Sequence, residues 1–403
     1  MFTNVIGSLT GLLPRNFIFA VYIPVLIYTS LNGVLLYITV AWVRGAVQVA
    51  LHDQLALFSA SCFIGTIVLA YILSSLTDAG REVLEGKHLR VLGRLVDEMR
   101  RDQERKYGDI ATDYNQSRVL GYQLSAAVPV WQEALRVAGN AGAAEQLVGF
   151  GQADPAMESL ENLRSKSRKA AVSRDEIQAA VDAMGVALTK FNVMNDVTLQ
   201  SARRDLLVVI GRIASRAHER EYALATRLQL FPLAGELMPT ALGNIAASLQ
   251  SYGVDRYGMD TAVFLNRLQA VLTKRADDKG YSLVIDAKTQ LDFLVAACFL
   301  SGFTGVTWAV LLAILGSSIA MFVFAAVSGF LLPMMFYTLC VQSYATYAQT
   351  LRACIDLNRF TLLKALDVPL PLTLREERQL WAALSHAALM GSEGLEISYD
   401  HAQ

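Results

Sequence analysis

Long stretches without any charged residue dominate the hydrophobic pattern of the chain. They cover residues 16–43, 54–77 and 293–351. A helix needs roughly 20 apolar residues to cross about 30 Å of hydrocarbon, so each of the first two stretches holds one membrane span. The third is long enough for two spans, with small polar residues at 316–318 suited to the turn between them. The pattern therefore predicts four membrane-spanning helices.

These spans divide the chain into four parts. Two transmembrane hairpins are expected at residues 1–78 and 291–345, on either side of a helical domain at 79–290, and residues 346–403 form a helical tail. The predicted fold class is all-α: a polytopic membrane protein with four transmembrane helices in two hairpins that flank a cytoplasmic helical domain. The spans themselves are expected at about residues 17–42, 55–77, 292–315 and 318–341.

Basic residues predict the orientation of the spans. Of the 35 Lys and Arg residues, the segment 79–290 holds 28 and the tail five, whereas the loop after the first span holds only Arg44 and the turn near Gly316 holds none. Because basic residues accumulate on the cytoplasmic side, both termini and the middle domain are expected in the cytoplasm. A hydrophobic fraction of 54% and a mean hydropathy of +0.37 agree with a membrane protein.

The segment between the hairpins has helical periodicity and almost no net charge. Its 28 basic and 26 acidic residues give little attraction for nucleic acid, and we expect no nucleic-acid partner. Helix breaks are expected near Lys106–Gly108, 139–155, Pro232–Pro239 and Gly253–Gly258. The pattern predicts a bundle or long antiparallel helical hairpins, with the last helix continuing into the third span.

Sequence patterns typical of enzymes and metal sites are missing. The chain has no H-E-x-x-H, G-x-S-x-G or C-x-x-C, and its five histidines are scattered, so we expect no catalytic residues, no metal and no cofactor. The spans hold no ionisable residue, which argues against an intramembrane proton relay. Polar Asn32, Thr304 and Thr307 can still line a neutral path.

Small residues recur every four positions along the third span. The stripe consists of Ala297, Ser301, Gly305, Ala309 and Ala313. Small residues at this spacing let the backbone of another helix approach closely. Two interpretations remain open: packing against the fourth span of the same chain, or a contact between copies of the protein.

One polar patch outside the spans is more specific than a generic helical domain requires. Asp260 can cap a helix that starts after it. Capping does not explain Arg256, Tyr257 and Arg267, which can form a charge and stacking cluster with Asp255 or Asp260 near the membrane surface. We therefore take Arg256, Tyr257, Asp260 and Arg267 as a candidate interaction cluster.

A second patch begins the helical tail. Thr373 and Glu376 have the spacing of a capping box, in which the hydroxyl accepts from the backbone of the third helical residue and the carboxylate accepts from the backbone of the cap. A short amphipathic helix should follow, with Leu380, Trp381 and Leu384 on its apolar face. We expect this helix to dock on the cytoplasmic domain.

These patches resemble a group of bacterial integral membrane proteins that have no established activity. The resemblance is carried by P-T-x-L-G-N at 239–244, R-Y-G-x-D at 256–260 and P-L-P-x-T-x-x-E-E-R-x-L-W at 369–381. In that group a basic residue and a Glu-Gly pair follow the second span, as Arg81 and residues 85–86 do here. The resemblance implies the four-span topology and a bacterial inner membrane, and it brings no catalytic or binding residues.

The leading hypothesis is a non-enzymatic inner-membrane protein that self-associates through its spans. Its cytoplasmic helical domain would sense or dock a protein partner and gate a pore or perturb the membrane. One alternative is a transporter or a stator-like component of an ion-driven machine, which could take its proton-carrying carboxylate from a partner. Another is a membrane-bound enzyme of unrecognised type, built around the candidate cluster.

Overall fold

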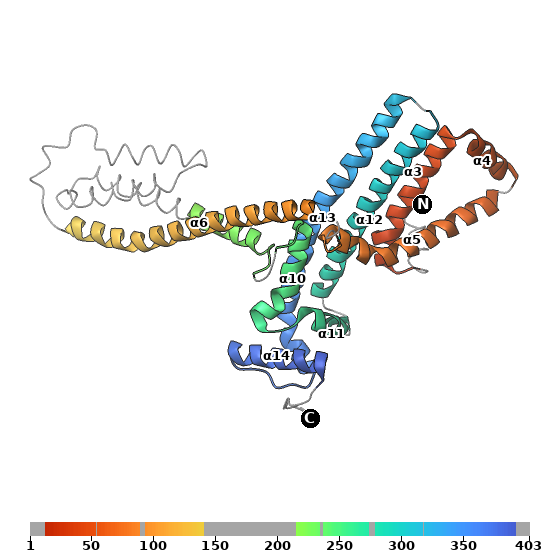
Figure 1. Ribbon diagram of the computed structural model, residues 1–403. Helices are drawn as coiled ribbons and strands as arrows, with labels where there is room; N and C mark the ends of the chain where they lie inside the picture. The colour runs from red at the N-terminus through yellow and green to blue at the C-terminus, as the bar shows by residue number, and fades with distance from the viewer. Residues whose placement is uncertain are drawn as a thin grey trace, which may run out of the picture. The chain divides into compact units, whose positions relative to one another are not determined.

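The computed structural model describes residues 13–53, 55–88, 93–140, 215–233, 237–273, 279–316 and 318–391. Within these ranges helices are the only regular secondary structure, as predicted (Figure 1). The break expected at 139–155 lies almost entirely outside the described residues. The chain forms two compact units, one of residues 1–104 with 230–403 and the other of residues 105–229, and each is described by itself.

The described residues include four helices that are long and apolar enough to cross a membrane, which confirms the predicted number. Each overlaps one of the spans expected from the charge-free stretches. They are the continuous run of α2 (Arg15–Phe17), the π-helix η1 (Ile18–Tyr22) and α3 (Ile23–Thr39), followed by α5 (Leu55–Glu85), α12 (Lys279–Ile314) and α13 (Ile319–Ala365).

The first span ends earlier than expected, at Thr39. A separate helix, α4 (Ala41–Asp53), follows where the sequence predicts a loop. Arg44 in α4 donates hydrogen bonds to the carbonyls of Tyr37 and Ile38, at 3.2 and 2.7 Å. These carbonyls have no partner within α3 because they belong to its last turn, so Arg44 closes the end of the helix.

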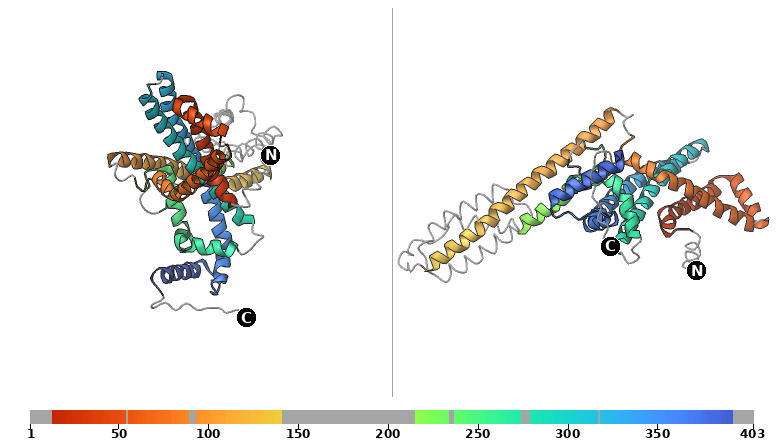
Figure 2. Two further views of the ribbon diagram at one scale, coloured as in Figure 1. Left: turned by 90° about the vertical axis from the view of Figure 1, so that its right-hand side faces the viewer. Right: turned by 90° about the horizontal axis from the view of Figure 1, so that it is seen from below.

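Helices α12 and α13 lie side by side along much of their length (Figures 1 and 2). At their closest approach, a Cβ atom added to Gly305 would lie 2.1 Å from the Cα atom of Gly329. Only glycine on both helices permits this distance. The centre of the small-residue stripe therefore packs against α13 of the same chain, whereas Ala313 at its end is exposed.

Pro333 interrupts the hydrogen-bond ladder of α13 at the same level. Its ring has no N–H, so the carbonyl of Gly329 receives no helical hydrogen bond from it. The thiol of Cys298 donates to the Pro333 carbonyl at 3.4 Å, and a Cβ on Gly302 would lie 3.4 Å from the proline ring. The proline is thus held against α12.

A polar contact also joins the first span to α12. The indole Nε1 of Trp308 donates to the side-chain oxygen of Asn32 at 2.6 Å, and the Asn32 amide donates to the Tyr28 carbonyl at 2.8 Å. Thr304 donates to the Leu300 carbonyl at 2.7 Å. Of the residues considered above for a neutral path, Asn32 is therefore engaged in a contact between helices and Thr304 in a bond within α12.

Two helices continue far beyond the apolar spans. At 1.5 Å per residue, the 47 residues of α13 extend about 70 Å, more than twice the roughly 30 Å of a hydrocarbon core. The expected domain boundaries near residues 290 and 345 fall inside α12 and α13. Neither helix breaks there, so the spans and the polar segments beyond them share the same helices.

The C-terminal part of α13 supports a group of helices that we call the helical cap. It comprises α10 (Ala241–Tyr257), α11 (Thr261–Thr273), α14 (Leu374–Met390) and residues 344–365 of α13. Trp381 of α14 is fully buried and meets the ring of Phe264 at a centroid distance of 5.1 Å. Other buried residues of this core include Leu242, Ile245, Leu249, Leu268, Leu272, Ile355, Leu362 and Leu363.

The helices of the helical cap begin and end at residues that satisfy or terminate their backbone hydrogen bonding. The Thr240 hydroxyl accepts from the amide of Gly243 at the start of α10, and Gly258 ends this helix in the left-handed conformation with φ of 77°. At the start of α14, the Thr373 hydroxyl accepts from the Glu376 amide while the Glu376 carboxylate accepts from the Thr373 amide. This is the reciprocal pair of a capping box.

Helix α6 (Arg94–Asn140) contradicts one expected break. It runs through Lys106–Gly108 without interruption. A single glycine costs a helix about 1 kcal/mol relative to alanine, which a helix of this length tolerates where no proline stands beside it, as at 106–108. In the unit of residues 105–229, residues 215–228 are also helical, and Arg220 donates to the Asp113 carboxylate at 3.1 Å.

Candidate functional site

The carboxylate of Asp356 lies at the centre of a polar cluster in the helical cap. The Tyr252 hydroxyl lies 2.9 Å from both of its oxygens, and the Tyr257 hydroxyl donates to one of them at 2.8 Å. The two tyrosine rings meet edge to face, with centroids 6.5 Å apart. Both tyrosines belong to the end of α10 and Asp356 to α13, so a single carboxylate joins the two helices.

Three arginines pack on these tyrosine rings. The guanidinium of Arg359 lies 4.4 Å from the centroid of Tyr257, while those of Arg352 and Arg256 lie 5.2 and 5.8 Å from the centroid of Tyr252. A cation within about 6 Å of an aromatic face contributes roughly 0.5–2 kcal/mol. We call these six residues, with Glu377, the Asp356 cluster.

Arg359 extends the cluster to α14. Its Nε donates to the Glu377 carboxylate at 2.7 Å, and its guanidinium also donates to the backbone carbonyl of Asp356. The side chains of Arg359 and Glu377 are only 18% and 4% exposed. Removing one partner of such a buried pair leaves an uncompensated charge and costs about 3–5 kcal/mol. The pair therefore anchors α14 to α13.

A second arginine ties α14 to α10. Arg378 donates to the backbone carbonyls of Asp255 and Arg256, at 3.0 and 3.1 Å. A Cβ on Gly258 would lie 2.6 Å from the Arg378 carbonyl oxygen. Glycine is required there both for its positive φ and for this close approach. The C-terminus of α10 is thus capped by a side chain of another helix.

The helix period explains why α13 can supply three members of the cluster. Arg352, Asp356 and Arg359 are spaced four and three residues apart, which places them on one face of a helix. Arg352 also donates to the hydroxyl of Ser248 on α10. The face of α13 that carries these groups is therefore the face that packs on α10.

Burial and the Asp356 carboxylate keep both tyrosines protonated. Burial, followed by the hydrogen bond to Asp356, raises the pKa of Tyr252 from 10.0 to about 12. The same two causes raise the pKa of Tyr257. The neighbouring Tyr252 is the largest cause that raises the pKa of Arg256. At neutral pH the hydroxyls are hydrogen-bond donors and Arg256 is a cation.

The structure divides the candidate interaction cluster into two groups. Arg256 and Tyr257 belong to the Asp356 cluster, as described above. Asp260 instead accepts from the backbone amides of Ala262 and Val263 at 2.9 and 3.2 Å, which makes it the N-cap of α11. Arg267 lies 5.1 Å from the centroid of the Phe264 ring.

The sequence-based reasoning missed the carboxylate that faces the tyrosines. That carboxylate is Asp356, rather than Asp255 or Asp260. It is 104 residues from Tyr252 and 99 from Tyr257 along the chain, so proximity in sequence does not reveal it. One signal was present: a helical stripe of charged residues at 352–359 that directly follows the charge-free stretch.

A buried glutamate lies at the end of α5. Glu85 is 2% exposed, and its carboxylate lies 2.8 Å from the ammonium of Lys87 and 3.5 Å from the guanidinium of Arg81. The Tyr344 hydroxyl of α13 donates to it at 3.3 Å. Arg81 also pairs with Asp78 at 3.0 Å. A buried carboxylate needs such partners, and here they link α5 to α13.

The motif at 239–244 packs directly against this end of α5. Gly86 has φ of 86°, and a Cβ on it would lie 2.7 Å from the Pro239 ring. A Cβ on Gly243 would lie 2.1 Å from the Glu85 carbonyl oxygen. Asn244 donates to the Gln103 side chain at 3.3 Å. Two of the segments that carry the resemblance, 85–86 and 239–244, therefore meet in one tight backbone contact.

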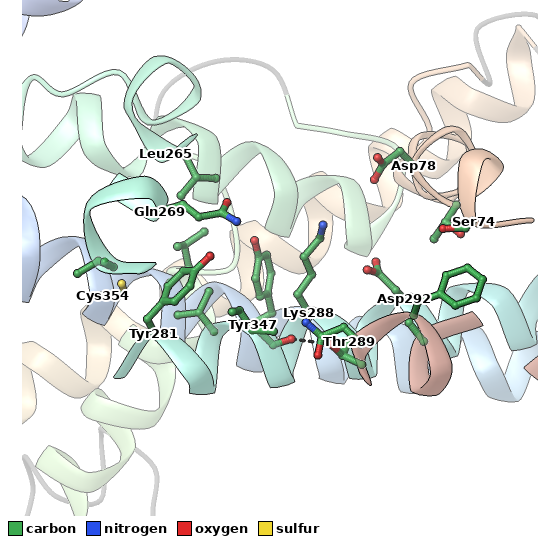
Figure 3. Close-up of a pocket in the computed structure, with 18 of the residues that line it drawn as sticks. Ser74, Asp78, Leu265, Gln269, Tyr281, Lys288, Thr289, Asp292, Tyr347 and Cys354 are labelled. Carbon is green, nitrogen blue, oxygen red and sulfur yellow. Dashed lines mark hydrogen bonds between the residues drawn. The ribbon is translucent and has the colours of Figure 1, made fainter. Parts of the chain in front are cut away.

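A cavity of about 410 Å³ is lined in part by Asp78, the carboxylate that pairs with Arg81. It is bounded by the start of the first span, the end of α5, and parts of α11, α12 and α13. Figure 3 shows Lys288, Asp292 and Tyr347 extending toward it, with Asp78 and Gln269 facing them. Polar and apolar side chains share its lining.

Across the described ranges, no three His, Cys, Asp or Glu side chains lie together so that they could hold a metal ion. The chain matches no protein-family model, no curated protein and no solved structure. The resemblance drawn from the motifs therefore stays an expectation.

Proposed function

We propose that this protein is a polytopic inner-membrane protein whose helical cap faces the cytoplasm and serves as a docking or sensing platform for a protein partner. Binding at the cap would be transmitted to the spans. The observation that carries the proposal is the continuity of α13. One unbroken helix holds Gly329 and Pro333 against α12 and also supplies Arg352, Asp356 and Arg359 to the cap.

The orientation is supported by the distribution of basic residues. The segment between the second and third spans and the tail after the fourth hold 33 of the 35 Lys and Arg residues, 28 and five respectively. This bias favours two hairpins that both enter from the cytoplasm. The motif resemblance favours a bacterial inner membrane.

Self-association and a gated pore are part of the same proposal. The centre of the small-residue stripe already contacts Gly329 in its own chain, so contacts between copies would use other faces of the spans. Large apolar side chains remain exposed on those faces, including Phe324 at 76% and Phe330 at 70%. Lipid or a second copy would cover them.

Reporter fusions in bacterial cells test the topology. A fluorescent protein fused after residue 391 should fluoresce, because it folds in the cytoplasm, and alkaline phosphatase inserted after Arg44 or Gly316 should be active outside. The converse pattern at either insertion site would overturn the proposed orientation. Full-length protein purified in detergent should also run as an oligomer in mass-resolved chromatography. A monomer without conductance in planar bilayers would overturn the pore.

A further inference from the structure

The cavity in Figure 3 lies where three spans reach their polar ends. Asp78 is the first charged residue after the second charge-free stretch, and Asp292 is the last one before the third. Residues at the start of the first span, including Asn16 and Phe17, line the same cavity. Because charged side chains stay out of hydrocarbon, this level corresponds to the headgroup region of a membrane.

The lining combines both signs of charge with an apolar wall. Asp78 and Asp292 contribute carboxylates and Lys288 an ammonium group, and Tyr281 and Tyr347 add hydroxyls. The rest of the surface includes Phe17, Val21, Leu268, Leu272, Val284 and Leu351. A cavity of this kind suits a ligand that carries a cation, an anion and an apolar portion.

One lining atom has a hydrogen-bonding capacity that the protein does not use. The Oδ1 atom of Asp292 is buried, and within the described part of the chain it has no hydrogen-bond partner. Asp78, by contrast, pairs with Arg81 at 3.0 Å. Buried carboxylate oxygens almost always accept hydrogen bonds, so Asp292 indicates a missing donor.

We propose that this cavity binds the headgroup of a zwitterionic phospholipid with a primary ammonium, a phosphoethanolamine lipid. The ammonium would donate to Asp292, and the phosphate would face Lys288 with the hydroxyls of Tyr281 and Tyr347. The acyl chains would leave along the apolar wall near Phe17. This inference rests on the proposed function, because it requires the spans to lie in a bilayer.

The chemistry of the cavity distinguishes this headgroup from others. A choline headgroup has the same charges but no N–H, so it cannot donate to the Asp292 oxygen. A phosphoglycerol headgroup has a negative charge and no cation, so the carboxylates of Asp78 and Asp292 would repel it. Free glycerophosphoethanolamine shares the polar groups of the lipid, but it lacks the acyl chains that would lie along the apolar wall near Phe17.

Lipid binding to the full-length protein in detergent tests the proposal. Native mass spectrometry would compare lipids with identical acyl chains and phosphoethanolamine, phosphocholine or phosphoglycerol heads. We expect phosphoethanolamine lipid to bind about tenfold more tightly than phosphocholine lipid, since hydrogen bonds to a charged group are among the stronger ones. Asp292→Asn should reduce that ratio to about twofold or less, since it removes the charge at this acceptor.

Two further variants separate the site from general effects. Asp286→Asn changes an exposed carboxylate on the same helix that does not line the cavity, and it should keep the tenfold ratio. Lys288→Gln should weaken the binding of the phosphoethanolamine and phosphocholine lipids alike and leave the ratio of their affinities unchanged. If Asp292→Asn does not fold, the ratio of phosphoethanolamine to phosphocholine binding in the wild type and in Lys288→Gln still tests the proposal.

Several outcomes would overturn the proposal. These are equal binding of phosphoethanolamine and phosphocholine lipids, tightest binding of the phosphoglycerol lipid, or an unchanged ratio in Asp292→Asn. Competition by free glycerophosphoethanolamine at the concentration of the lipid would assign the cavity to a soluble ligand instead. None of these results affects the reporter fusions, so failure of the lipid site is distinguishable from failure of the topology.

Discussion

At the scale of single residues, Asp356 is the carboxylate on which the polar contacts of the helical cap meet. It receives hydrogen bonds from Tyr252 and Tyr257, and its backbone carbonyl receives one from Arg359. Charged groups that are shared in this way hold helices in one register, because a shifted helix would leave a buried charge without its partners.

The raised pKa of Tyr252 predicts a loss of stability at high pH. Tyrosine in the unfolded chain ionises near pH 10.0, whereas in the fold the pKa of Tyr252 is about 12. Between these values the unfolded state has released a proton that the folded state keeps, so the free energy of unfolding falls as pH rises. Asp356→Asn should make this fall shallower without abolishing it, because burial is the larger cause of the shift.

Chemical unfolding in non-ionic detergent between about pH 9 and 11 measures this effect. Tyr222→Phe provides the matched control, because that hydroxyl is on an exposed side chain, 77% accessible, outside the cap. Its pH dependence should follow that of the wild type. Identical pH dependence in Asp356→Asn and wild type would show that Asp356 does not stabilise the protonated tyrosines.

At the scale of helices, the contact between Gly305 and Gly329 determines how closely α12 and α13 pack. Gly305→Ala should destabilise the protein by about 1–3 kcal/mol, since its Cβ would lie 2.1 Å from a backbone atom that cannot rotate away. Gly302→Ala is the matched substitution in the same turn, where the new Cβ would meet only the Pro333 ring at 3.4 Å. It should be tolerated.

Thermal unfolding of the purified variants in detergent compares the two substitutions. The melting temperature should fall for Gly305→Ala and stay close to the wild-type value for Gly302→Ala. Equal melting temperatures would mean that the helices can separate at Gly305 without loss, and that the close approach is not a stabilising contact.

The number and place of the spans followed from the sequence because the absence of charge is a strong constraint. Burying a charged residue in hydrocarbon costs several kcal/mol, so the spans must fall within 16–43, 54–77 and 293–351. The helix ends were less predictable. α6 continues through Gly108, since the cost of one glycine is distributed over a long helix.

At the scale of the whole molecule, we expect the stability of the helical cap to depend strongly on one side chain, that of Trp381. It is fully buried and packs on Phe264, so Trp381→Ala should destabilise the cap by about 3–5 kcal/mol. Hydrogen exchange should accelerate in α14 and α11. Protection around Gly305 should be retained, because the contact between Gly305 and Gly329 lies outside the cap.

Leu389→Ala on the same helix is the control for this measurement. The side chain is 61% exposed, and its removal should change stability by no more than about 0.5 kcal/mol. If exchange accelerated equally in the spans and the cap of Trp381→Ala, the two would unfold as one cooperative unit.

The candidate site was only half predictable from the sequence. Arg256 and Tyr257 were recognised because capping could not explain them, and both belong to the Asp356 cluster. Asp260 and Arg267 lie in the same patch of sequence but serve α11. The missing partner came from a helix about a hundred residues away, and single-sequence patterns do not encode which helix faces end up opposite each other.

Because α13 is continuous, a change of helix direction at Pro333 would move the whole segment that follows it. The helix continues from Pro333 for 32 residues to Ala365 (365 − 333), which corresponds to about 48 Å at 1.5 Å per residue. An angular change of about 10° at the proline would displace Ala365 by about 8 Å. The same rotation would carry Asp356, 23 residues away (356 − 333), through about 6 Å.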